Sequence, residues 1–278
     1  MIRLDTRDGA IHATVWSEPP IIYMDNWALD RFSTDLVLRN EFLGLFRDRG
    51  TLAVSLMSVV EIGAHGAQHR PELRSFLEAI GPHWVPLTID PFLVMNAQET
   101  SQERQSACLS SAFLNDPDFS SKLLADDLSL VHIVDLTRGG SGAMLKASSD
   151  GSTRELCDSI NALRSNAASQ TLDRGWPEML FDNRVSMRPI YNAFLRLCVK
   201  DSFTFTANHA RDLYHAVTSM GCADMTILDS HWANQARKVQ GLIGMPSDFV
   251  RIYSPHNLSQ FLADLAALPP SRGLFDPV

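Results

Sequence analysis

Short apolar runs that alternate with helical stretches constrain the fold of this chain more than any other feature. Three of these runs have the length and composition of buried strands: Ile21–Met24, Leu52–Ser55 and Met225–Leu228. A stretch typical of a helix follows each run. Strands that alternate with helices predict an α/β fold with a mostly parallel central sheet flanked by helices.

Caps and turn residues predict the remaining elements. At the N-terminus they predict a hairpin from Ile2–Leu4 to Ile11–Val15 around Asp8-Gly9. In the first part of the chain they predict three helices: one from Ser33-Thr34 to about Arg49, one that begins at Ser58, and one from Pro71 to near Gly81. Towards the C-terminus they predict a helix from His209 to Met220, capped by Asn208 and Gly221, a helix from Asp229 to about Gln240, a strand at Phe249–Tyr253 and a helix from Asn257.

The middle of the chain has a different pattern, with amphipathic helical stretches and polar loops. Leu130–Leu136 could form one strand, whereas Arg138–Gly142 and Ser148–Ser152 are typical of loops. We therefore expect a single domain over residues 1–278, with a core of about 20–90 and 207–265. A large, mainly helical insertion of about 91–206 is expected to pack beside the core.

Composition narrows the classes of function. Hydrophobic residues make up 45% and charged residues 20% of the chain, which is ordinary for a globular protein. A net charge of −8 argues against unspecific coating of nucleic acid, but not against a nuclease that reaches phosphate through bound cations. No apolar run of membrane-spanning length and no secretory leader are present, so we expect a cytoplasmic protein without a membrane partner. The four cysteines form no Cys-x-x-Cys pair and are expected to be reduced thiols.

Four acids occupy positions where the carboxyl ends of the strands should meet. Asp25 and Asp229 end apolar runs, Glu61 lies in the helix after the second run, and Asp212 lies in the helix before the last run. Clustered carboxylates repel one another, and Mg²⁺ or Mn²⁺ usually relieves that repulsion. The pattern indicates phosphodiester hydrolysis by two metal ions.

Each acid also has an ordinary structural interpretation. Asp25 and Asp229 could be helix N-caps, Ser58-x-x-Glu61 spells a capping box, and Asp212 could be a solvated helix residue. The functional interpretation therefore depends on all four acids in this order.

That order resembles the PIN-domain nucleases, in particular toxin-like members with a large insertion. The motifs are Ile22-Tyr-Met-Asp25, Ser58-x-x-Glu61, Asp212-Leu-Tyr-His-Ala216 and Ala223-Asp-Met-Thr-Ile-Leu-Asp229. The resemblance implies a Mg²⁺- or Mn²⁺-dependent endonuclease that cuts RNA to 5′-phosphate and 3′-hydroxyl ends. It makes Asp25, Glu61, Asp212 and Asp229 the catalytic metal ligands. Many members are the toxins of toxin–antitoxin pairs, so an antitoxin or another protein is an expected partner.

Several neighbouring residues have expected roles around these ligands. Asp224 is an alternative fourth acid. Ser58 and His215 are expected to contact the metal ligands and orient them without binding the metal themselves. Family members often have Thr where this chain has Ile227, so one supporting hydroxyl is missing. Residues that could bind substrate phosphate, or could simply be solvated, are Arg184, Arg188, Arg237 and Lys238.

Three rival interpretations stay open. Glu61, His65 and His69 share one helix face and could bind zinc instead. The chain could also be a non-catalytic PIN-like module that binds RNA or protein, or a metal-dependent phosphohydrolase of small substrates.

Overall fold

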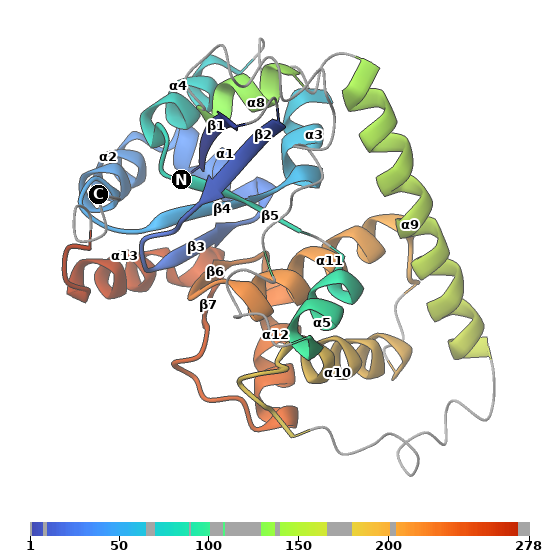
Figure 1. Ribbon diagram of the computed structural model, residues 1–278. Coiled ribbons are helices and arrows are strands. Elements are labelled where there is room, and N and C mark those ends of the chain that lie inside the picture. Colours follow the sequence, from blue (N-terminus) through green and yellow to red (C-terminus); the bar gives the residue numbers. More distant parts are fainter. Residues whose placement is uncertain are drawn as a thin grey trace.

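Five short parallel strands form the centre of the structure (Figure 1). They lie in the order β5-β4-β3-β6-β7. The bounds are β3 Ile21–Met24, β4 Thr51–Ser55, β5 Trp84–Leu87, β6 Met225–Ile227 and β7 Arg251–Tyr253. The computed structural model describes residues 2–7, 10–64, 70–88, 90–100, 108, 129–136, 140–165, 180–200 and 204–271. The expected α/β fold with a parallel central sheet is confirmed.

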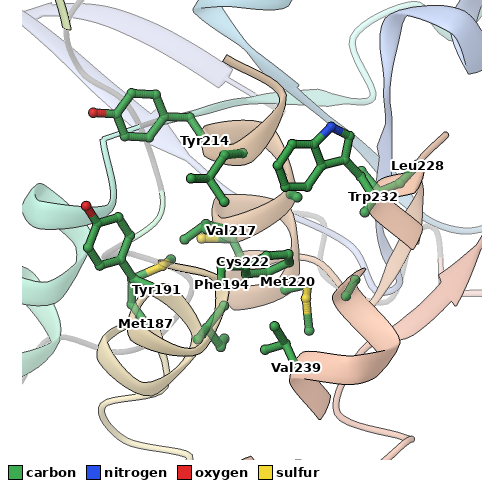
Figure 2. Close-up of a cluster of buried hydrophobic side chains, with 14 of the residues drawn as sticks. Met187, Tyr191, Phe194, Tyr214, Val217, Met220, Cys222, Leu228, Trp232 and Val239 are labelled. Atoms are coloured by element: carbon green, nitrogen blue, oxygen red, sulfur yellow. The ribbon is translucent and has the colours of Figure 1, made fainter. Parts of the chain in front are cut away.

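Helices cover both faces of this sheet, so its strands are apolar on both sides. In β3, Tyr23 faces one apolar cluster while Ile22 and Met24 face the other. The Tyr23 side of the sheet packs against α5 (Pro91–Glu99), α9 (Gly140–Ser165), α10 (Met187–Lys200), α11 (Ala207–Cys222) and α12 (Ser230–Ile243), and part of its core is drawn in Figure 2. The opposite side packs against α1 (Asn26–Thr34), α2 (Leu36–Phe46), α3 (Leu56–Ala64), α4 (Pro71–Ile80), α8 (Leu130–Leu136) and α13 (Leu258–Ala267), which follows the short helix η3 (Pro255–Asn257).

Local signals misplaced several element ends. The expected helix from Ser33-Thr34 is two helices, because Asp35 ends α1 and caps α2 by accepting hydrogen bonds from Val37 and Leu38. Thr206, not Asn208, caps α11. Gly221 lies inside α11 and not at its cap, and a Cβ there would lie 2.4 Å from Cε of Met187. This glycine therefore leaves room for the Met187 side chain of α10.

The edge strand β5 was not predicted at all. Its four residues include Pro86, which weakens a strand pattern and is tolerated mainly at sheet edges. Each of its residues nevertheless pairs with one of β4, from Leu52–Trp84 to Ser55–Leu87.

Residues between 91 and 206 contribute only helices to the part of the chain that the structure describes. The possible strand at Leu130–Leu136 is wrong, because this segment forms α8. It buries Leu130, Val131, Ile133 and Val134 at helical spacing. The loop signals at Ser148–Ser152 are also wrong, because these residues lie within α9.

The helix α9 is held by packing and not by its own propensity. Its buried Leu156 and Ile160 join the cluster on the Tyr23 face of the sheet. The helix runs beside both α3 and α11 (Figure 1). Such tertiary contacts outweigh the weak helix preference of serine and glycine.

The N-terminal segment forms the expected hairpin. Strands β1 (Ile2–Arg7) and β2 (Ala10–Val15) pair antiparallel, with Ile2 opposite Val15. Asp8 and Gly9 lie outside the described residues. Among the helices that are described, none has both the length and the apolar character needed to cross a membrane.

The expectation of four reduced thiols is wrong for two of them. Cys108 in the insertion and Cys222 at the end of α11 form a buried disulfide, although 114 positions separate them. Cys157 and Cys198 remain thiols. No short motif marks a bridge between such distant cysteines, which is why sequence reasoning missed it. Disulfides are rare in a reducing cytosol, so this bridge argues against the cytoplasmic location, which stays a prediction.

We expect this bridge to be visible by counting thiols. Protein that is denatured without reductant should react with a maleimide at two cysteines, and at four after reduction. Peptide mapping should place the unreduced label on Cys157 and Cys198. Four labelled cysteines in unreduced protein would contradict the bridge.

Candidate active site

Two of the four acids lie at the ends of neighbouring strands. Met24 of β3 pairs with Ile227 of β6, and the Asp25 amide donates a 3.0 Å hydrogen bond to the Ile227 carbonyl. Asp229 lies two residues beyond β6. Since the strands are parallel, both carboxylates lie at the same edge of the sheet.

These two acids are also helix caps, as their ordinary interpretation predicts. Oδ1 of Asp25 accepts a 2.6 Å hydrogen bond from the Asn26 amide at the start of α1. Oδ1 of Asp229 accepts a 2.8 Å hydrogen bond from the Trp232 amide at the start of α12. Each cap uses one carboxyl oxygen and fixes the orientation of the group.

Glu61 and Asp212 come from the helices α3 and α11. The predicted capping box at Ser58 is wrong, because α3 begins at Leu56 and Ser55 Oγ accepts the Ser58 amide at 2.9 Å. Glu61 therefore lies inside the helix, where its carboxylate receives a hydrogen bond from Asn26 Nδ2. Its Oε1 lies 3.1 Å from Nε of Arg211.

The four charges act on one another across the site. The pKa of Asp25 is raised to about 7, first by burial and then by the charges of Asp212, Asp229 and Glu61, while the Asn26 amide opposes the shift. The four acids come from four different elements and lie close enough to interact electrostatically. Their mutual repulsion is only partly compensated.

Asp212 is affected in the same way. Burial is the main cause that raises its pKa to about 6, followed by the charge of Asp229. The side chain of Trp232 and the charge of Arg211 act in the opposite direction. Asp212 is therefore not the solvated helix residue of its ordinary interpretation.

The donor set fits a hard divalent cation in type, since it consists of carboxylate oxygens with excess negative charge. Within the described ranges, no three His, Cys, Asp or Glu side chains are grouped closely enough to hold one ion as they stand. Glu61 is turned toward Arg211 and Asn26.

A buried polar network lies next to the acids. The Tyr23 hydroxyl lies 2.5 Å from Nδ1 of His215 and also bonds to Ser58, whose Oγ lies 2.9 Å from Oγ of Ser55. Burial raises the pKa of Tyr23 and lowers that of His215 to about 4. The imidazole is therefore neutral at pH 7, and the tautomer that it adopts decides which of the two groups donates in this hydrogen bond.

This network includes both residues that were expected behind the ligands, Ser58 and His215, and joins them through Tyr23. Sequence reasoning missed Tyr23, although a hydroxyl-bearing ring in an apolar strand that ends in Asp25 was a signal. It also missed Asn26 and Trp232, which touch the acids only because α1 and α12 begin at this edge.

Asp224 does not belong to the site. It precedes β6, and its Oδ2 accepts a 2.7 Å hydrogen bond from the amide of Ile21, the first residue of β3. In a parallel sheet, that position lies at the edge opposite to Asp25. The structure therefore removes Asp224 as an alternative fourth acid. His65 and His69, the other ligands of the zinc alternative, lie outside the described residues.

The expected phosphate-binding residues gain no support. Arg188 pairs with Glu99 of α5, and Arg237 donates a 3.1 Å hydrogen bond to the Ile252 carbonyl. Arg184 and Lys238 are exposed. Arg237 and Lys238 lie more than two turns along α12 from Asp229, which is roughly 12 Å. The alternative of structural or solvated basic residues fits these positions better.

Comparison of the chain with protein-family models, with curated proteins and with solved structures found no match.

The acid repulsion predicts a specific dependence of stability on pH. The folded chain binds the Asp212 proton more tightly than the unfolded chain, so stability falls as pH rises from about 4 to about 6. Asp212→Asn removes the charge but keeps an acceptor for Trp232. In metal-free buffer at pH 8 it should raise the free energy of unfolding by about 1–2 kcal/mol, and at pH 4 it should change little.

Urea unfolding at both pH values measures this difference. Asp158→Asn, the same substitution at an exposed position of α9, is the control and should change little at either pH. An Asp212→Asn variant that is less stable than the wild type at pH 8 would contradict the repulsion.

Proposed function

We propose that this protein is a metal-dependent endonuclease of the PIN-like type that hydrolyses phosphodiester bonds in RNA. The observation that carries the proposal is the convergence of Asp25, Glu61, Asp212 and Asp229 at the carboxyl edge of a parallel sheet, with incompletely compensated charge. A structural cluster of acids would be expected to have more partners that neutralise it.

The four acids would hold Mg²⁺ or Mn²⁺, which supplies a hydroxide nucleophile at neutral pH and stabilises the charge that develops on phosphate. The chain contributes orientation. The helix caps fix Asp25 and Asp229, and the Trp232 side chain holds Asp212. The neutral Tyr23–His215 pair supports the site without adding charge.

Cleavage assays with matched acid variants test the proposal. Asp25→Asn and Asp229→Asn should each lower Mn²⁺-dependent cleavage of RNA by at least about 100-fold, because each removes a ligand charge that no neighbour replaces. Asp224→Asn is the matched control, since it makes the same change at the opposite edge of the sheet and keeps an acceptor for the Ile21 amide. It should retain cleavage.

The same assay separates the alternatives. Hydrolysis of nucleotides without cleavage of RNA would favour a phosphohydrolase of small substrates. RNA binding without any cleavage would favour a non-catalytic module. Equal activity in all three variants would exclude the proposed site. The antitoxin or other protein partner stays a prediction from the resemblance.

Metal binding should also stabilise the fold. At 100 times its Kd, Mn²⁺ should raise the stability of the wild-type protein by about 2.7 kcal/mol through mass action. Asp25→Asn should lose most of this gain and Asp224→Asn should keep it. Thermal melts with Mn²⁺ and with EDTA measure the difference, and equal gains in all three proteins would place the metal elsewhere.

A further inference from the structure

Arg211 occupies a central position between the acid cluster and the insertion. It precedes Asp212 on α11, and its guanidinium lies between Glu61 of α3 and Asp150 of α9. Its Nε is 3.1 Å from Oε1 of Glu61, and its NH2 nitrogen is 3.0 Å from Oδ1 of Asp150. The exposed fractions of the three side chains are 24%, 23% and 31%, so the ion pairs are partly shielded from water.

Both carboxyl oxygens of Glu61 already have partners. Oε1 faces Arg211 and Oε2 accepts from Nδ2 of Asn26. A divalent cation binds through these same oxygens and needs close, well-aimed ligands. Glu61 therefore cannot serve the guanidinium and a metal equally well.

Asp150 keeps the guanidinium in this place. Its Oδ2 also lies 3.3 Å from Nζ of Lys146, one turn earlier on α9, so the aspartate is itself held. The surrounding stretch, Ser148–Ser152, has weak helix propensity, yet its backbone is helical around Asp150, which contacts Arg211. Arg211 is thus tied to the insertion as well as to the site.

We infer that Arg211 is a tethered cation that competes with the metal for Glu61, and that Asp150 retains the guanidinium when Glu61 turns to the metal. This inference rests on the proposed function. It makes Arg211 a positioning residue that sets how tightly the site binds its metal, and it links metal affinity to a residue of the insertion.

Titration calorimetry with Mn²⁺ as the only ligand tests the competition without an activity readout. Arg211→Gln removes the competing cation and should tighten the Kd for Mn²⁺ by about three- to fivefold. Arg39→Gln makes the same change of net charge on α2, where the guanidinium donates to Ser75, and should leave the Kd within about twofold of wild type. An unchanged or weaker Kd for Arg211→Gln would overturn the inference.

A second variant separates local competition from net charge and also serves if Arg211→Gln does not fold. Arg211→Lys keeps the charge but loses the planar fork that reaches two carboxylates at once. The Kd of Arg211→Lys for Mn²⁺ should lie between the Kd of the wild type and that of Arg211→Gln. If Arg211→Gln does not fold, the Kd of Arg211→Lys should still be lower than that of the wild type. A wild-type Kd in both Arg211 variants would overturn the competition, whereas a tighter Kd in Arg211→Gln alone would show that the positive charge, and not the planar fork, competes for Glu61.

Failure of this inference differs from failure of the proposed function. If wild-type protein binds Mn²⁺ and loses it on Asp25→Asn, while both Arg211 variants bind no more tightly, only the competition is wrong. If neither the wild type nor Arg211→Gln binds Mn²⁺, both proposals are wrong.

Discussion

The pairing of β3 with β6 is the contact on which the rest of the structure depends. These strands lie side by side although about 200 positions separate them, with Ile22 opposite Met225 and Met24 opposite Ile227. The Asp25 amide extends the pairing one step beyond the strand ends. A shift of register by one residue would turn Tyr23 and Ile22 to the wrong faces and would part Asp25 from Asp229. The apolar contacts that fix this register therefore also fix the spacing of the acids.

Bringing the acids together has a cost in stability. Burial and mutual repulsion raise the pKa of Asp25 and Asp212, so at neutral pH the folded chain holds charges that the unfolded chain would hold more easily. The two apolar clusters on either side of the sheet offset this cost. Arg211 relieves part of it at Glu61, through a cation that belongs to the chain itself.

Sequence reasoning reached the elements and residues that depend on local pattern. It placed four strands of the sheet within two residues. It also predicted that Asp25 and Asp229 follow strands at one edge of the sheet, because parallel strands share one carboxyl edge. It failed where distant packing decides. The apolar sequence of α8 has a pattern that is also typical of a strand, and only its packing shows that it is a helix. The strand β5 was missed because it contains Pro86. The partners Arg211 and Asp150 meet only because α9 crosses α11, which no spacing in the sequence reveals. Ile227 shows the same limit, since its side chain faces the apolar cluster on the α1 side and only its carbonyl serves Asp25.

Two separate constraints thus set the geometry of the four acids. Hydrogen bonding between β3 and β6 holds Asp25 and Asp229, whereas Glu61 and Asp212 lie on helices that pack on opposite faces of the sheet. The sheet alone does not fix the distance between those two helices. The helix α9 packs against both of them (Figure 1). Arg211 joins all three helices through its ion pairs with Glu61 and Asp150. The insertion therefore helps to position the site, because its helix α9 contacts the two helices that carry Glu61 and Asp212, which the strands do not connect.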